Sequence, residues 1–130
     1  MNIFELKGLK ILVVDDDADA VMMFAELLKH EGGLVDKTQS SASALQLIEN
    51  GNYDLLISDV SMPEMNGYDF IKKVRFLDSG CKLLAVAMTG HGRQADEENA
   101  KNSGFDIHLF KPVSLKQLKE ALARYKSSTT

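Results

Sequence analysis

Short aliphatic runs alternate along the chain with longer segments whose apolar residues recur at helical spacing. The runs cover residues 10–14, 34–38, 54–58, 83–87 and 107–110. The runs DLLIS (54–58) and LLAVA (83–87) show no alternation of polar and apolar positions. Strands that are buried on both faces of a parallel sheet have this pattern, so we predict five strands with a buried centre.

Apolar stripes at helical spacing fall between and after these runs. They consist of Ala20, Val21, Phe24, Leu27 and Leu28; Ala44, Leu45, Leu47 and Ile48; Phe70, Ile71, Val74 and Leu77; and Leu115, Leu118, Leu122 and Tyr125. The last stripe follows Ser114, a good N-cap residue. Residues 92–102 offer only Ala95 and Ala100, which predicts a weakly anchored helix. Five alternating pairs of strand and helix predict an α/β fold, with a parallel sheet covered by helices on both faces.

Length and composition fit one domain. The chain has 130 residues, 45% of them hydrophobic, and we expect a domain over residues 1–126 with a frayed tail over 127–130. The net charge of −4 offers no general field for a nucleic-acid backbone, so we expect no direct nucleic-acid binding. No apolar run reaches about 18 residues, and Cys81 is the single cysteine, so we expect no membrane segment, no internal disulfide and a cytoplasmic location. The six methionines are interpreted as core filler.

Candidate chemistry gathers where the predicted strands end, which is the edge where open α/β sheets bind ligands. The residues there are Asp15, Asp16 and Asp17 after the first strand, Asp59 after the third, Thr89 after the fourth and Lys111, followed by Pro112, after the fifth. Converging carboxylates repel one another unless a cation neutralises them. Oxygen ligands favour a hard divalent ion, so Asp15, Asp16, Asp59 and one backbone carbonyl are a candidate incomplete shell for Mg²⁺, with Mn²⁺ as an alternative.

An incomplete metal shell can also take phosphoryl oxygens. Asp59 stands alone at its strand end, facing the acidic pair, which makes it the candidate nucleophile for an acyl phosphate. The ammonium of Lys111 and the hydroxyl of Thr89 are suited to phosphoryl oxygens. Asp17 is interpreted as a helix N-cap rather than as a ligand.

Four motifs in the order of the strand ends resemble the receiver domains of two-component response regulators over nearly the whole chain. They are ILVVDDD (11–17), LLISDVSMPEMNGYDFI (55–71), VAMTG (86–90) and FKPV (110–113). The resemblance implies a flavodoxin-like doubly wound (βα)5 fold with strand order 2-1-3-4-5. It also implies a cis peptide bond at Lys111–Pro112, and Gly67 fits the loop after the acceptor as a residue that tolerates a positive φ.

Carried over by position, the resemblance assigns one role to each candidate residue. Asp15 and Asp16 are the metal-binding acidic pair, Asp59 is the phosphoacceptor, the Ser61 carbonyl completes the metal shell, Thr89 is the switch hydroxyl and Lys111 contacts the phosphoryl group. A second switch position, often Tyr or Phe in the family, is His108 here. With FKPV after it, this histidine resembles receivers of hybrid histidine kinases or chemotaxis regulators.

The family mechanism implies a phosphoryl donor and an output partner. The donor is a sensor histidine kinase, a histidine phosphotransfer protein or a small phosphodonor, and the receiver catalyses transfer to itself and slow hydrolysis. Phosphorylation biases a face made of the fourth helix, the fifth strand and the last helix, which an output protein or domain reads. The chain is thus expected to be a switch rather than a conventional enzyme.

Three alternatives remain open at this point. A haloacid-dehalogenase-like phosphatase also uses an Asp nucleophile after a strand, but neither Asp15–Asp19 nor Asp59–Ser61 gives its DxDx motif followed by Thr or Val. A flavin or nucleotide binder shares the fold, yet no glycine-rich phosphate loop follows the first strand. A receiver that is never phosphorylated would act through protein contacts alone, although all five key side chains are present.

Overall fold

The computed structural model describes residues 5–62, 65–90 and 104–128, with side chains up to residue 126. Its strands are β1 (Lys10–Val14), β2 (Leu34–Thr38), β3 (Leu55–Asp59), β4 (Leu84–Thr89) and β5 (Ile107–Phe110). Its helices are α1 (Ala18–His30), α2 (Ser41–Asn50), α3 (Gly67–Phe76) and α5 (Leu115–Ser128). The helix expected over residues 92–102 lies outside the described residues.

The five strands form one parallel sheet in the order β2-β1-β3-β4-β5, which confirms the predicted fold class. β3 and β4 each extend one or two residues past the predicted end, so Asp59 and Thr89 are the last residues of their strands. The register of the sheet aligns the carboxyl ends of β1, β3, β4 and β5: Val14 pairs with Ser58, Asp59 with Met88, and Thr89 with Phe110.

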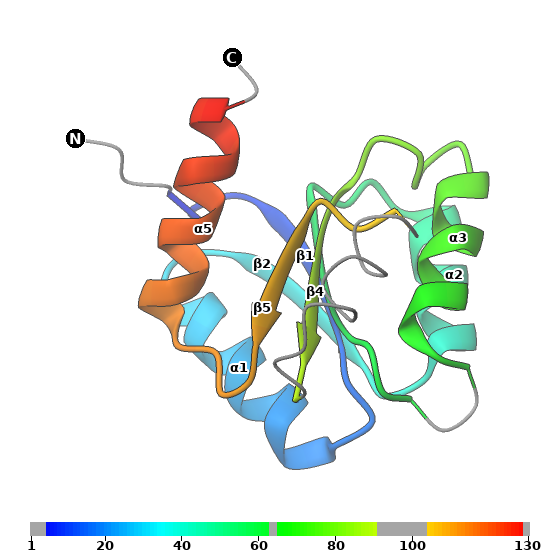
Figure 1. The fold of residues 1–130 in the computed structure, drawn as a ribbon, viewed down its shortest axis with the longest axis horizontal. Coiled ribbons are helices and arrows are strands. Elements are labelled where there is room, and N and C mark those ends of the chain that lie inside the picture. The colour runs from blue at the N-terminus through cyan, green and yellow to red at the C-terminus, as the bar shows by residue number, and fades with distance from the viewer. Residues whose placement is uncertain (1–4, 63–64, 91–103, 129–130) are drawn as a thin grey trace.

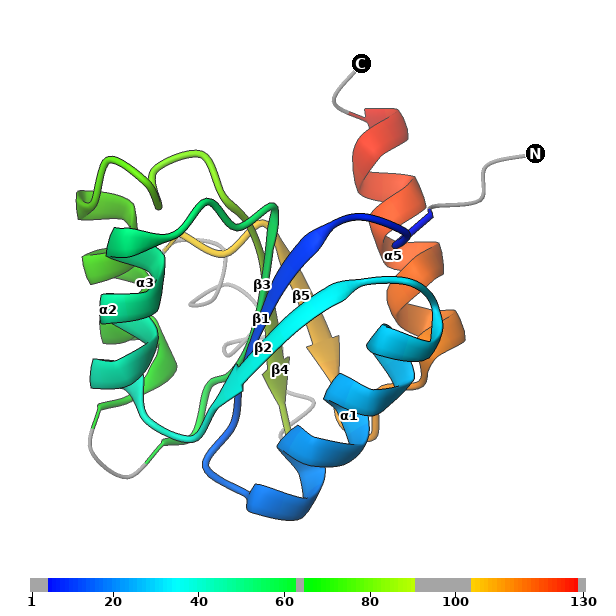
Figure 2. The same ribbon diagram turned by 180° about the vertical axis from the view of Figure 1, so that it is seen from behind.

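Helices cover both faces of the sheet. Figure 1 shows α1 and α5 on one face and α2 and α3 on the other, and Figure 2 shows the same two layers from behind. Side chains of β1 alternate between the two cores: Leu12 and Val14 pack on the α2 and α3 side, while Ile11 and Val13 pack on the α1 and α5 side. Every residue of β3 is buried, as expected for a strand covered on both faces, and apart from Ser58 and Asp59 at its carboxyl end the strand is apolar.

Polar caps begin the helices at the positions that the sequence favours. The side chain of Asp17 accepts hydrogen bonds from the backbone N–H groups of Asp19 and Ala20, which confirms its predicted role as the N-cap of α1. Before α5, the Ser114 hydroxyl accepts from the Gln117 N–H, and the Gln117 side chain accepts from the Ser114 N–H. This reciprocal capping box defines where the last helix begins.

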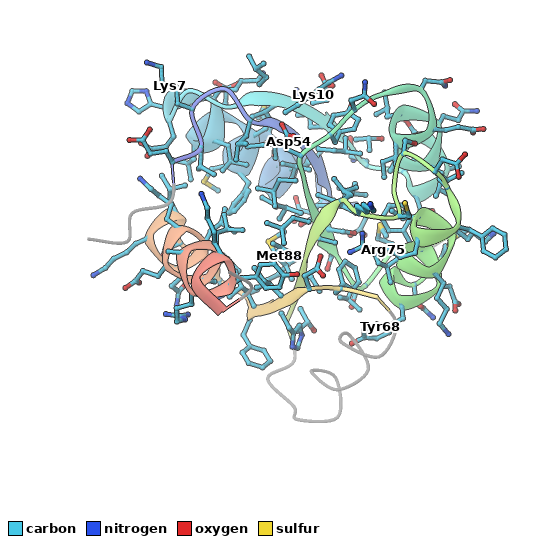
Figure 3. All side chains as sticks on the ribbon, turned by 90° about the horizontal axis from the view of Figure 1, so that it is seen from above. Lys7, Lys10, Asp54, Tyr68, Arg75 and Met88 are labelled. Carbon is cyan, nitrogen blue, oxygen red and sulfur yellow. The ribbon has the colours of Figure 1, made fainter. Side chains whose placement is uncertain are left out.

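The amino ends of β4 and β5 are tied together by one arginine of α3. Arg75 donates to the backbone carbonyls of Gly80, Leu83 and Gly104, and its guanidinium lies 2.9 Å from the Asp106 carboxylate. Figure 3 shows Arg75 extending from α3 toward the sheet. This network holds the segment after the undescribed residues 91–103 against α3 and β4, far from the carboxyl ends.

Two sequence interpretations were wrong in their physical reason. Gly67 does not have a positive φ; it is needed because a Cβ atom there would lie 2.6 Å from the Cα of Val60. The methionines are not all core filler, since Met22 and Met23 on α1 are 52% and 63% exposed.

Among the described residues, no helix combines the length and the apolar character needed to cross a bilayer.

Candidate functional site

The candidate residues meet at the carboxyl edge of the sheet. Asp15 follows β1, Asp59 ends β3, Thr89 ends β4 and Lys111 follows β5. The backbone continues the sheet beyond the strands, because the Asp15 N–H donates to the Thr38 carbonyl and the Lys111 N–H donates to the Thr89 carbonyl at 2.7 Å. The structure therefore brings these side chains to one edge, as their positions in the sequence predicted.

Three carboxylates form a tight cluster at this edge. Asp15, Asp16 and Asp59 each present an oxygen atom, and these oxygens all lie within 4.8 Å of one another. Asp15 and Asp59 are almost fully buried, at 2% and 3% exposure, whereas Asp16 is exposed. The cluster thus has two buried carboxylates and one that faces solvent.

One ammonium group is shared by the two buried carboxylates. The Nζ atom of Lys111 lies 3.2 Å from Asp15 Oδ2 and 3.3 Å from Asp59 Oδ1. The Lys111–Pro112 peptide bond is cis, as the resemblance implied. With all groups ionised, three carboxylates and one ammonium leave the cluster with a charge of −2, which a single divalent cation balances.

Burial and the shared ammonium act in opposite directions on the ionisation of the site. Burial raises the pKa of Asp59 to about 6, and the Asp15 charge adds to this, while the Ser61 N–H and the Lys111 ammonium lower it. Burial alone would lower the pKa of Lys111, but the Asp59 and Asp15 carboxylates raise it above its ordinary value. The ammonium therefore stays charged, whereas one buried carboxylate remains poorly compensated.

Backbone groups fix the orientation of both buried carboxylates. Asp15 Oδ1 accepts from the Asp17 N–H at 3.0 Å, and Asp59 Oδ1 accepts from the Ser61 N–H at 3.1 Å. These bonds leave further carboxylate oxygen positions for other ligands, because each carboxylate can accept several hydrogen bonds or metal contacts. The predicted contact of the Ser61 carbonyl with a metal stays a prediction.

The donor set fits a hard divalent cation. All three side chains offer oxygen, they converge from two strand ends, and one of them faces solvent, which suits an ion such as Mg²⁺ that keeps several of its waters. The described residues place no histidine or cysteine in this cluster, so a softer metal is disfavoured.

The two predicted switch residues occupy different environments. Thr89 is buried, at 2% exposure, as the last residue of β4. His108 is half-buried on β5, with its ring edge-on to Phe110 at a centroid separation of 4.9 Å. Their switch roles stay predictions, because the segment expected to respond lies among residues 91–103.

Sequence reasoning missed an apolar groove beside the carboxylates. The groove, of about 410 Å³, runs between α1 and the segment after β5, and it is lined by Met23, Phe24, Leu27, Pro112 and Val113 together with Asp15 and Lys111. The available signal was the width of the α1 stripe, which was interpreted as core although Leu27 is 43% exposed. The groove thus joins an open apolar surface to the charged cluster.

Comparisons with known proteins agree with this geometry. A family model described as the response regulator receiver domain matches residues 11–123. An uncharacterized 14.6 kDa protein encoded in the sodA1 3' region of Leptolyngbya boryana is 40% identical over 120 residues, which are 92% of each chain. The sensor histidine kinase RcsC of Salmonella typhi is 34% identical over 115 residues, which are 88% of this chain but only 12% of the kinase.

Solved structures extend the likeness to the whole sheet. The chemotaxis response regulator CheY4 of Vibrio cholerae has a TM-score of 0.83 at 28% identity, covering 90% of this chain and 98% of that one. The receiver domain of the sensor histidine kinase PA1611 from Pseudomonas aeruginosa has a TM-score of 0.82 at 26% identity, covering 92% and 98%. These likenesses favour a receiver over the phosphatase and flavin-binding alternatives. The chain belongs to the response regulator receiver domain family, the phosphoacceptor switches of two-component signalling.

Proposed function

We propose that Asp59 is the phosphoacceptor of this switch, that Asp15, Asp16 and Asp59 hold a divalent cation, and that Lys111 and Thr89 bind phosphoryl oxygens. The observation that carries the proposal is the approach of the Asp59 carboxylate to within 3.3 Å of the Lys111 ammonium inside the acidic cluster. A buried nucleophile with a cation and a metal-binding group beside it is the arrangement that phosphoryl transfer requires.

The cation is Mg²⁺, with Mn²⁺ as a working substitute, and the Ser61 carbonyl is its fourth protein ligand. When bound, the ion polarises phosphoryl oxygens and neutralises the charge that builds up in transfer. Support comes from the similar PA1611 receiver, whose structure has a magnesium ion coordinated in the active-site cleft. It also comes from the charge of −2 on the cluster, which would otherwise repel an anionic phosphoryl donor.

The reaction transfers a phosphoryl group from a histidine of the donor. The Asp59 carboxylate oxygen forms a bond to phosphorus while the bond from phosphorus to the donor's nitrogen breaks, and the electron pair of that bond stays on the imidazole. Only ionised Asp59 can attack. Its pKa of about 6 keeps the carboxylate mostly ionised at neutral pH while making it a stronger base than an ordinary aspartate.

The other side chains act on the phosphoryl oxygens. The Lys111 ammonium, which contacts both buried carboxylates, exchanges one of these contacts for a phosphoryl oxygen. The Thr89 hydroxyl donates to another oxygen, and His108 responds on the neighbouring strand. We expect these movements to alter the face formed by the segment 92–102, β5 and α5, where an output protein or domain is bound.

The donor is a sensor histidine kinase or a histidine phosphotransfer protein, and we place the chain in the cytoplasm as one domain over residues 1–126. The groove of about 410 Å³ next to the cluster suits this donor, because an apolar helix carrying the phosphorylated histidine would bury Met23 and Leu27 while its phosphoryl group reached Asp59. The net charge of −4 argues against direct nucleic-acid binding.

Intact-mass spectrometry after incubation with Mg²⁺ and acetyl phosphate tests the proposal. We expect a mass gain of one phosphoryl group that is absent without the metal and absent in Asp59→Asn. Asp78→Asn is the matched control, because Asp78 is an exposed aspartate of the loop after α3. No mass gain would indicate a receiver that is never phosphorylated, and steady turnover of acetyl phosphate that persists in Asp59→Asn would indicate a phosphatase.

A further inference from the structure

Asp16 differs from the other two carboxylates of the cluster in how its backbone is held. It lies in the loop between β1 and α1, is exposed, and contributes one of the three clustered oxygens. The residues on either side of it are fixed by their own side chains: Asp15 accepts from the Asp17 N–H, and Asp17 caps α1. Holding an exposed loop side chain in one orientation toward an ion costs conformational entropy. This cost is smaller if another contact already fixes the backbone of the residue.

That support comes from the neighbouring loop. The side-chain amide of Gln39 donates a hydrogen bond from Nε2 to the backbone carbonyl of Asp16 at 3.1 Å. Gln39 itself is anchored on both sides, because the Thr38 carbonyl accepts from the Asp15 N–H and the Ser40 N–H donates to the Thr38 hydroxyl oxygen. Ser40 is in turn the N-cap of α2. The amide therefore links the Asp16 peptide to a fixed part of the fold.

We propose that Gln39 is a positioning residue for the cation site, which it supports by fixing the Asp16 peptide so that the carboxylate faces the ion. This inference rests on the cation site of the proposed function. Glutamine suits this role because the acceptor is a carbonyl oxygen, so the partner must be a donor. A lysine or arginine donor would place a positive charge beside the cation, whereas a neutral amide donates without opposing it.

The affinity for Mn²⁺, followed by the electron paramagnetic resonance signal of the free ion, tests the inference. Gln39→Met keeps the length and removes the donor, and we expect it to weaken Mn²⁺ binding by about 2- to 10-fold, the effect of one exposed hydrogen bond. Gln46→Met is the matched control, because Gln46 is exposed on α2. The control should bind Mn²⁺ and melt like the wild type, and Gln39→Met should lower the metal-free melting temperature by no more than about 5 °C, the effect of one hydrogen bond.

A double-mutant cycle distinguishes positioning of Asp16 from a general effect on the loop. In an Asp16→Ala background the ligand is already lost, so Gln39→Met should cause little further loss of affinity. Equal losses in both backgrounds would overturn the inference, as would wild-type affinity in Gln39→Met or a fall in the metal-free melting temperature well beyond about 5 °C. If the wild type itself failed to bind Mn²⁺, the proposed cation site would be wrong, which is a distinct result.

Discussion

Replacing Asp59, the proposed phosphoacceptor, by its amide should stabilise the metal-free protein. Burial raises the pKa of Asp59 from its ordinary value of 3.8 to about 6, which means that the fold disfavours the ionised carboxylate. The unfolded chain ionises near its ordinary pKa, so stability is lost as the pH rises from about 4 to about 6, and the loss is complete above that range. Asp59→Asn has no such ionisation and keeps an oxygen that can accept from the Ser61 N–H.

The size of the effect follows from the same pKa. A rise from 3.8 to about 6 corresponds to about 3 kcal/mol between the protonated and ionised forms. The Lys111 contact lowers the pKa of Asp59 and is therefore already included in this figure, so we expect a net stabilisation of up to about 3 kcal/mol above pH 6. For a chain of this length that is at most about 11 °C in melting temperature.

Thermal melts in a chelator, followed by circular dichroism at about pH 4.5 and about pH 7.5, provide the measurement. The gap between Asp59→Asn and the wild type should be larger at the higher pH, and Asp78→Asn should show no comparable gap. Adding Mg²⁺ should stabilise the wild type more than Asp59→Asn, because the neutral amide oxygen is a weaker ligand than the carboxylate. A variant that melts below the wild type in chelator at the higher pH would refute the reasoning.

Three further substitutions probe separate parts of the molecule. Lys111→Met should slow phosphorylation by acetyl phosphate at least about 100-fold, as seen by intact mass over time, while Mn²⁺ still binds, because in our proposal the ammonium contacts the phosphoryl group and is not a metal ligand. Arg75→Met should destabilise the fold by about 3 kcal/mol in urea titrations, since it removes the ion pair with Asp106 and the guanidinium's hydrogen bonds to three backbone carbonyls. Gly67→Ala should cost about 2 kcal/mol in the same titrations, because its Cβ would lie 2.6 Å from the Cα of Val60; an unchanged midpoint would show that the backbone can shift freely.

Most of the fold and the placement of the site could be predicted because both depend on strand ends. The apolar runs fix where β1, β3 and β5 stop, and in a parallel sheet these ends share one edge, so Asp15, Asp59 and Lys111 had to lie near one another. The one-residue extension of β3 changed little, since Asp59 was expected at its end in either case.

Features that depend on contacts between distant segments could not be predicted in this way. The exposure of Met23 depends on how α1 lies relative to the segment after β5, and the need for Gly67 depends on the close approach of the chain at Val60. Arg75 gave no signal in the sequence, because its acceptors are mostly backbone carbonyls of other loops. Gln39 was missed for a similar reason, since its acceptor is a carbonyl oxygen of the β1–α1 loop.

The acidic cluster costs folding free energy, and it lies at the end of the most buried strand of the sheet. β3 is buried along its full length, and Val14 beside it is completely buried, so hydrophobic burial around the cluster offsets the unfavourable ionisation of Asp59. The same burial keeps the carboxylate basic and keeps water from weakening its contact with Lys111. A more exposed aspartate would destabilise the fold less. The free energy of the fold would then also change less when a metal ion or a phosphoryl group neutralised the carboxylate. Under the proposed function, the destabilised carboxylate is therefore the source of the free-energy difference by which metal binding and phosphorylation alter the fold.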